Sequence, residues 1–231
     1  NSPANPTGAV YSAEELQALA DVLRAPDAQH VHILCDDIYE HVLYEGEFAT
    51  IAQIAPDLKE RTLTLNGLSK SYCMTGWRIG YAAGAQDLIK AITKIQGQSV
   101  TSPTTMCQWA AIAALQGDQS FIATHNAHFK HRRDKIVAAL NVIDGITCMI
   151  PPGAFYVYPN CAGLIGKTTL TGKTIANDED FCTYLLEEAQ IAVVHGAAFG
   201  LSPHFRISYA ASDDAIANAC SRLVDACNLL T

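Results

Sequence analysis

Alternation between two hydrophobic patterns is the feature that most constrains how this chain can fold. Short apolar runs of strand length, such as Val31 to Cys35, alternate along the sequence with segments whose apolar residues recur at helical spacing. The run from Val31 to Cys35 is apolar throughout, which is typical of a strand buried on both faces, and it stops at two aspartates. The pattern predicts an α/β architecture, in which helices cover a sheet.

The same criteria predict the individual elements. The first helix begins at Ser12, because Ser12 and Glu15 have the spacing of a capping box. The other expected helices span residues 87–95, 105–115, 120–143, 178–188 and 212–230. The expected strands span residues 31–35, 61–65, 79–83, 147–150, 155–158, 191–194 and 205–209. The helix over 120–143 is long enough to join two domains, and its basic residues, Arg133 among them, are expected on polar faces.

Composition and charge narrow the possible partners. The chain has 231 residues, of which 49% are hydrophobic, and its net charge is −8. This charge disfavours nucleic acid or an anionic membrane surface as the main partner, because both attract basic faces. No apolar run reaches membrane-spanning length, and the eight cysteines contain no C-x-x-C pair, so we expect a cytoplasmic protein with reduced thiols. Any anion that the protein binds must therefore meet a few individually placed cations.

The segment from Leu65 to Tyr81 carries the most specific chemistry. Lys70 lies in a serine-rich loop after a predicted strand, and Arg78 follows eight residues later between two glycines. A phosphorylated aldehyde cofactor needs both groups, since an amine forms the Schiff base and a guanidinium binds the phosphate. Residue types alone also allow a solvent-exposed lysine and a surface arginine that flank a hairpin.

This segment resembles the cofactor-lysine signature of the class I pyridoxal-phosphate aminotransferases, in the branch of bacterial and archaeal aspartate and prephenate aminotransferases. It reads S-K-S-Y-C-M-T-G-W-R-I-G from Ser69 to Gly80. Five further motifs are similar to those of the family and follow in its order: Asn5–Gly8, Asp36–Glu40, Gly153–Pro159, His195–Gly200 and Phe205–Ala210. Six ordered motifs over essentially the whole chain make a specific match.

The resemblance implies a fold and a domain division. The expected fold is that of fold-type I pyridoxal-phosphate-dependent transferases. Residues 1–125 would form the C-terminal part of the large α/β cofactor domain, and residues 126–231 the small α+β domain, which the long helix enters. The family's large domain begins well before Asn5, so we expect this chain to be the C-terminal part of a protein of roughly 400 residues.

The resemblance also assigns four residues to pyridoxal 5′-phosphate. Lys70 would bind the cofactor aldehyde and later move a proton at the substrate α-carbon, and Arg78 would bind the phosphate. Asp36 would keep the pyridine nitrogen protonated, and Tyr39 would donate a hydrogen bond to the phenolic oxygen of the ring. Asp37 is expected to start a helix instead, because its spacing from Glu40 is that of a capping box.

Two more residues are assigned to the substrate side. Asn5 would donate to the same ring oxygen and lie beside the substrate, although Asn-Pro is also an ordinary turn pair. Arg206 would bind the substrate α-carboxylate, because a cation in an apolar strand needs an anionic partner. A salt bridge from Arg206 to a nearby aspartate is the structural alternative. No metal site is expected, and His125, His128 and His131 are interpreted as a solvated helix face.

The implied activity is exchange of an amino group between L-aspartate, or a similar amino acid, and 2-oxoglutarate. The first alternative is transamination of prephenate or of aromatic amino acids. The second alternative is that the chain is a non-catalytic fragment, which lacks the N-terminal half of the site. A homodimer with active sites at the subunit interface is expected. Substrate preference stays open, because His195 to Ala197 replaces the usual P-G-S and no arginine lies between Arg78 and Arg132 to bind a second carboxylate.

Overall fold

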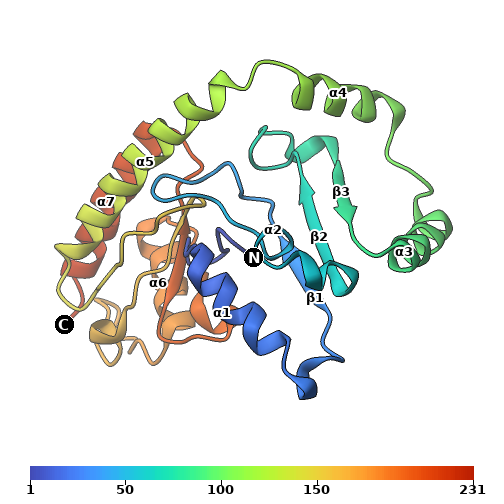
Figure 1. Cartoon of the computed structure of the whole chain (residues 1–231). Coiled ribbons are helices and arrows are strands. Elements are labelled where there is room, and N and C mark those ends of the chain that lie inside the picture. The colour runs from blue at the N-terminus through green and yellow to red at the C-terminus, as the bar shows by residue number, and fades with distance from the viewer. The chain divides into compact units, whose positions relative to one another are not determined.

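The computed structural model describes all 231 residues and confirms the α/β class, with helices and strands that alternate along the chain (Figure 1). The chain divides into two compact units. The N-terminal unit comprises Asn1–Ala4 and Ala9–His125, and the C-terminal unit comprises Asn5–Gly8 and Asn126–Thr231. No helix combines the length and the apolar composition that crossing a membrane requires.

A three-stranded sheet forms the centre of the N-terminal unit. Strands β1 (Ile33–Asp36), β2 (Thr62–Gly67) and β3 (Gly80–Ala83) lie in that order. β1 runs parallel to β2, with Asp36 opposite Leu65, and β3 runs antiparallel to β2. The carboxyl ends of β1 and β2 therefore lie at the same edge of the sheet as the start of β3.

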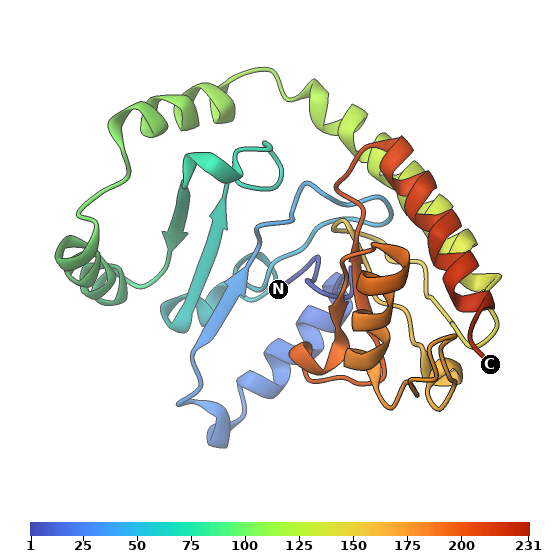
Figure 2. The same cartoon turned by 180° about the vertical axis from the view of Figure 1, so that it is seen from behind.

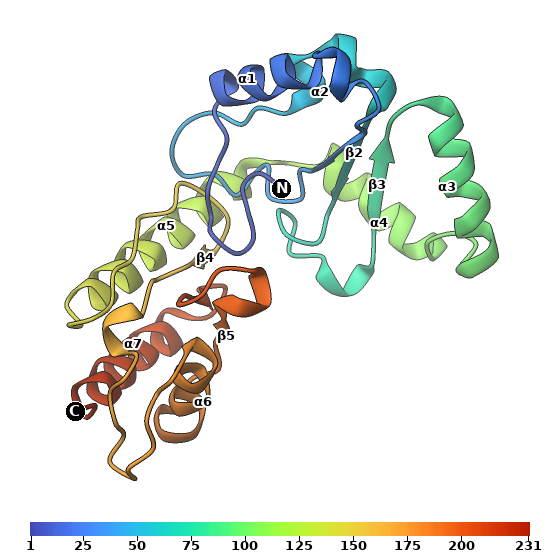
Figure 3. The ribbon, with the colours of Figure 1, turned by 90° about the horizontal axis from the view of Figure 1, so that it is seen from below.

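Four helices belong wholly to this unit: α1 (Ala13–Leu23), α2 (Ile51–Ile54), α3 (Gln86–Ser99) and α4 (Thr105–Gln116). The predicted capping box starts α1, since the Ser12 hydroxyl accepts a hydrogen bond from the Glu15 N–H and the Glu15 carboxylate accepts one from the Ser12 N–H. α1 lies beside α2 (Figure 3), and the two helices enclose an apolar cluster. The buried side chains of this cluster are Leu16, Ala20, Ala49, Ile51, Ala55 and Leu58.

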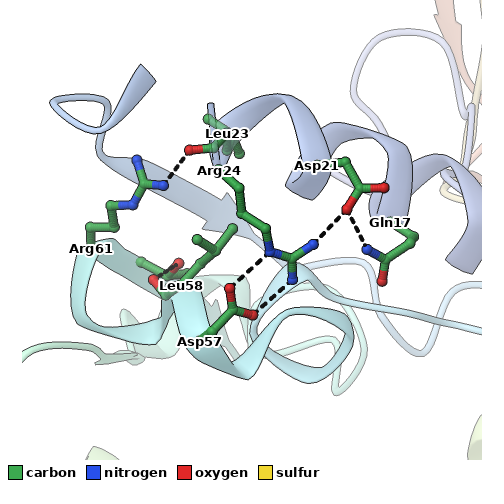
Figure 4. Close-up of polar contacts among 8 residues, drawn as sticks. Gln17, Asp21, Leu23, Arg24, Asp57, Leu58 and Arg61 are labelled. Carbon is green, nitrogen blue, oxygen red and sulfur yellow. Dashed lines mark hydrogen bonds and ion pairs between the residues drawn. The ribbon is translucent and has the colours of Figure 1, made fainter. Parts of the chain in front are cut away.

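Two arginines close the end of α1 in different ways (Figure 4). The Arg61 guanidinium donates to the carbonyl oxygens of Leu23, Ala28 (2.7 Å) and Val31 (3.1 Å). Helix ends leave carbonyl groups without intrahelical partners, so Arg61 satisfies acceptors that would otherwise lose hydrogen bonds. The Arg24 guanidinium instead donates to both carboxylate oxygens of Asp57, each at 2.8 Å, in a solvent-exposed ion pair.

We expect Arg61→Ala to destabilise the protein more than Arg24→Ala. Loss of the Arg61 guanidinium removes a hydrogen-bond donor from three carbonyl groups. This loss should lower the free energy of unfolding by about 1–3 kcal/mol. Arg24 pairs with Asp21 and Asp57 at the surface, where water weakens ion pairs, so its loss should cost less. Urea unfolding of both variants measures the difference. An equal loss of unfolding free energy in the two variants would show that Arg61 acts only as a surface charge.

A second small sheet, with helices packed beside it, forms the centre of the C-terminal unit (Figure 2). Strands β4 (Tyr156–Val157), β6 (Phe205–Ser208) and β5 (Val194–His195) lie in that order, and both pairings are antiparallel. Helix α6 (Asp178–Ala189) packs against β5 and against α7 (Asp213–Asn228). Helix α5 (Ser120–Asn141) contains the point in the sequence at which the two units divide. The buried side chains of the second sheet and α6 include Val157, Phe181, Leu185 and Phe205, and Tyr209, directly after β6, is buried as well.

Two strand predictions in this unit are wrong. Residues 147–150 form no strand, and only Thr147 is bridged, to Asn160. The strand expected at 191–194 begins at Val194 and continues to His195. Both segments are apolar, but a short apolar run only indicates burial, and the backbone pairing partner decides where a strand begins.

The prediction that Arg133 lies on a polar face is also wrong. Its side chain is 2% exposed. The guanidinium donates to the Pro151 carbonyl oxygen at 2.8 Å and forms an ion pair with Asp134 at 2.8 Å. A buried cation is tolerated when it is paired and hydrogen-bonded, and periodicity alone does not reveal those partners.

Candidate active site

Three of the predicted site residues come together at one edge of the N-terminal sheet. Asp36 is the last residue of β1, Lys70 lies in the loop that follows β2, and Arg78 lies two residues before β3. Because β1 is parallel to β2 and β3 is antiparallel to it, all three positions lie at the same edge. Ligands of α/β sheets bind at the carboxyl ends of parallel strands, so this edge is a candidate binding site.

The loop that carries Lys70 is closed by its own backbone. The N–H of Leu68 donates to the Ile79 carbonyl (3.4 Å), the N–H of Met74 donates to the Leu68 carbonyl (3.3 Å), and the N–H of Cys73 donates to the Lys70 carbonyl (3.2 Å). At the base of the loop, a Cβ atom on Gly67 would lie 2.9 Å from the Ile79 carbonyl oxygen. Lys70 is half-buried and is therefore presented from a fixed loop.

Arg78 has an unusual backbone conformation for its residue type. Its φ of 54° lies in the left-handed region. Non-glycine residues adopt this conformation only at a cost in free energy, and such strained residues are often found at functional sites. Its guanidinium Nη1 donates to the Thr75 carbonyl at 2.8 Å, and no carboxylate forms an ion pair with it. The exposed guanidinium keeps further N–H donors for an anion such as a phosphate.

The two aspartates after β1 differ in their surroundings. The Asp36 carboxylate accepts a hydrogen bond from the Ile38 N–H at 3.3 Å. Asp37 is buried, and burial raises the pKa of its carboxyl above the ordinary value, although the nearby Thr50 hydroxyl partly opposes this shift. Tyr39, the third predicted residue here, is also buried, with 3% of its surface exposed.

The prediction that Asp37 starts a helix is wrong. Residues 38–41 form turns, in which the N–H of Glu40 donates to the Asp37 carbonyl and the N–H of Val42 donates to the Tyr39 carbonyl. The N–H of Asp37 donates to the Leu65 carbonyl of β2 at 2.9 Å. The sheet hydrogen bonding thus extends one residue beyond β1, and the chain turns sharply after it.

Arg206 in β6 is enclosed by aromatic rings in the C-terminal unit. The centre of its guanidinium lies 4.9 Å from the Tyr156 ring and 5.0 Å from the Phe199 ring. Nη1 donates to the Asn5 amide oxygen at 2.8 Å, whereas Nε is buried without a hydrogen-bond partner. Arg206 forms no ion pair with an aspartate, so the structural alternative raised by the sequence is not what this arginine does. A half-buried planar cation without an anionic partner in the chain fits a carboxylate.

Close backbone contact brings Asn5 to Arg206. Gly8, with φ of 70°, accepts a hydrogen bond at its carbonyl oxygen from the Gly153 N–H at 3.1 Å. A Cβ atom on Gly8 would lie 2.5 Å from the Cβ atom of Pro151, so no larger residue fits. The two glycine-containing motifs therefore interlock and hold the preceding Asn5 beside the arginine.

Tyr156 and Phe199 also belong to this site and were not predicted from the sequence. Tyr156 lies opposite Ser208, and Ser208 and Arg206 point to the same face of β6, which makes Tyr156 a diagonal neighbour of the arginine. Each of these aromatic residues lies within a family motif, Tyr156 in Gly153–Pro159 and Phe199 in His195–Gly200, and this position was the available signal. The motifs did not predict the strand register that brings Tyr156 to Arg206.

Comparison with known proteins identifies the family. Residues 1–223 match the family model described as aminotransferase class I and II. The chain belongs to this family. It is 52% identical over 233 residues to an aspartate aminotransferase of Rhizobium meliloti (strain 1021), covering 100% of this chain and 56% of the relative. It is 54% identical over 229 residues to an aspartate/prephenate aminotransferase of Cereibacter sphaeroides (strain ATCC 17029 / ATH 2.4.9), covering 98% and 56% respectively.

A solved aminotransferase structure agrees with these sequence matches. The crystal structure of the aspartate aminotransferase from Rhizobium meliloti superposes with a TM-score of 0.96 at 51% identity, covering 100% of this chain and 57% of that one. The chain thus spans little more than half the length of the aminotransferases that it matches.

The residues of the N-terminal unit fit pyridoxal 5′-phosphate, the cofactor of this aminotransferase family. One sheet edge offers an amine from Lys70, a carboxylate from Asp36 and an unpaired guanidinium from Arg78, as this cofactor's aldehyde, ring nitrogen and phosphate require. Nowhere do three or more His, Cys, Asp or Glu side chains gather in a group that could hold a metal ion.

Proposed function

We propose that the protein that contains this chain catalyses pyridoxal-phosphate-dependent transamination between L-aspartate and 2-oxoglutarate. The observation that carries the proposal is the placement of Asp36, Lys70 and Arg78 at one edge of the N-terminal sheet. The names of the relatives, aspartate aminotransferase and aspartate/prephenate aminotransferase, support the reaction and the amino donor.

The N-terminal unit would hold the cofactor. When bound, pyridoxal phosphate supplies an aldehyde that binds amines covalently and a ring that draws electrons from the α-carbon. The Lys70 amine would hold this aldehyde and, once displaced, take up and return the proton of the substrate α-carbon. The Asp36 carboxylate would hold a proton on the pyridine nitrogen, the Tyr39 hydroxyl would donate to the ring oxygen, and Arg78 would bind the phosphate.

The C-terminal unit would bind the substrate. The Arg206 guanidinium, which has no carboxylate partner within the chain, would bind the α-carboxylate of the amino acid or the oxo acid. Its hydrogen bond to Asn5 and its two aromatic neighbours fix the plane of the guanidinium, which favours a planar anion. Asn5 would in addition donate its amide N–H to the phenolic oxygen of the cofactor.

The family resemblance supports further proposals. Residues 1–125 would be the C-terminal part of the large cofactor domain, and residues 126–231 the small domain. The complete protein would be a cytoplasmic homodimer with active sites at the subunit interface, and its partners would be small amino and oxo acids rather than nucleic acid or a membrane.

A panel of amino donors with 2-oxoglutarate, run on the complete protein, tests the proposed function. We expect L-aspartate to give the highest kcat/KM. Prephenate as amino acceptor and the aromatic amino acids are the second candidate substrates, because one relative's name includes prephenate. A complete protein that transaminates neither these amino donors nor prephenate would refute the proposal. Activity of the complete protein combined with inactivity of the 231-residue chain alone would show that this chain by itself is a non-catalytic part of the enzyme.

A further inference from the structure

A buried carboxylate lies behind the loop that carries Phe199. Asp178, the first residue of α6, is 1% exposed, and no cation pairs with it. One carboxylate oxygen accepts a hydrogen bond from the Ala197 N–H at 2.8 Å, and the other accepts one from the Ser202 hydroxyl. Burial raises the pKa of Asp178, but the hydrogen bonds from Ser202 and from backbone N–H groups lower it by more. Asp178 is therefore a buried carboxylate, and each of its oxygens accepts a hydrogen bond from this loop.

The loop itself is closed tightly around its own backbone. The N–H of Leu201 donates to the Gly196 carbonyl at 3.1 Å, and the N–H of Gly196 donates to the His204 carbonyl at 2.6 Å. The Tyr158 hydroxyl bridges the carbonyls of Gly196 (3.1 Å) and Leu201 (3.2 Å). A Cβ atom on Gly196 would lie 2.2 Å from the Leu201 carbonyl oxygen, so the closure requires glycine at this position. Asp178 binds this closed loop at two points that flank Phe199.

Phe199 supplies one of the two rings against Arg206. The other ring, that of Tyr156, lies on β4 and is fixed by the pairing of β4 with β6. The Phe199 ring lies outside the sheet, in the short helical turn Gly196–Phe199, and packs edge-on against the ring of Tyr158, whose hydroxyl also holds this loop. The orientation of the guanidinium on this side therefore depends on the loop that Asp178 holds.

We propose that Asp178 is a positioning residue for substrate binding, which anchors the Gly196–Ser202 loop and thereby holds Phe199 against the carboxylate-binding Arg206. This inference rests on the proposed function, because it takes the α-carboxylate as the ligand of Arg206. Asp178, at the start of α6, would thus contribute to selectivity for carboxylates without touching the substrate.

Three variants of the complete protein test the proposal. Asp178→Asn replaces one acceptor oxygen with a donor, Ser202→Ala removes one partner from an exposed position, and Glu179→Gln is the control, because it removes a charge from an exposed neighbour on the same helix turn. The readouts are kcat and KM for L-aspartate, the rate with a primary amine that lacks an α-carboxylate, the calorimetric Kd of succinate, and backbone hydrogen exchange over residues 196–202.

We expect Asp178→Asn to raise the KM for aspartate and the Kd of succinate roughly tenfold, as loss of hydrogen bonds to a charged group predicts. The rate with the primary amine should stay unchanged, and exchange over residues 196–202 should accelerate. Ser202→Ala should shift the same quantities in the same direction but less, and Glu179→Gln should shift none of them. If Asp178→Asn does not fold, Ser202→Ala decides the question.

Two results would overturn the proposal. Faster loop exchange with an unchanged KM and Kd would show that the loop does not position Arg206. An equal loss of rate with aspartate and with the primary amine would show a general structural role. A wild-type protein that lacks transamination would refute the proposed function alone, because the succinate Kd and the exchange rates still test the link between Asp178 and Arg206.

Discussion

Replacing Lys70 with alanine is expected to lower kcat for transamination by more than about 10³-fold, since positioned proton transfer alone contributes 10²–10⁴-fold in enzymes. The variant loses both the amine that would bind the cofactor aldehyde and the group that would move the α-carbon proton. The Lys70 loop is closed by its own backbone hydrogen bonds, so the substitution should leave the fold intact. Steady-state kinetics on the complete protein measures this effect.

Lys59→Ala is the matched control for this prediction. Lys59 lies in the short helical turn Pro56–Arg61, is exposed, and belongs to the same unit, but the turn precedes β2 and so lies away from the edge where β2 ends. Its removal should leave kcat within about twofold of the wild type, as surface substitutions usually do. Equal activity of the Lys70→Ala variant and the wild type would exclude the catalytic role of Lys70.

Arg206→Lys is expected to raise the KM for both the amino acid and the oxo acid by about 100-fold, a loss of about 2.7 kcal/mol in binding. A lysine keeps the charge but cannot present the planar, bidentate donors of a guanidinium. It also loses the flat contact with the rings of Tyr156 and Phe199. The measurement is the KM for L-aspartate and for 2-oxoglutarate, with kcat determined in parallel.

Arg222→Lys controls for the general effect of exchanging an arginine in this unit. Arg222 lies on α7, is exposed, and donates only long hydrogen bonds of 3.4 Å to backbone carbonyls. Its exchange should leave both KM values unchanged. If Arg206→Lys also left them unchanged, the α-carboxylate would have to bind elsewhere.

Sequence patterns predicted the fold where the element was long or ended in a clear signal. The capping box at Ser12 and the apolar run that ends at Asp36 both correspond to observed elements. The run at 147–150 does not, because its backbone forms only one bridge, and Asp37 starts no helix, because β2 still holds its N–H. Backbone pairing with a distant segment is missing in the first case and present in the second, and local sequence does not contain that information.

For the candidate site, too, the sequence predicted the residues within motifs but not the contacts between distant segments. The motifs named Asp36, Lys70 and Arg78, and the sheet register brings them to one edge. They did not indicate that Tyr156 and Phe199 enclose Arg206, nor that the buried Asp178 anchors the Phe199 loop. These contacts depend on strand register and on loop closure between segments far apart in the chain, which residue spacing does not specify.

Covalent trapping of the cofactor tests the central claim, that Lys70 is the pyridoxal-phosphate lysine, most directly. The complete protein is incubated with pyridoxal phosphate, reduced with borohydride and digested, and the peptides are mapped by mass spectrometry. We predict one cofactor per chain, attached to the peptide at Lys70, and none in the Lys70→Ala variant. Cofactor fixed to a different lysine, or an unmodified Lys70 in an active protein, would contradict this account.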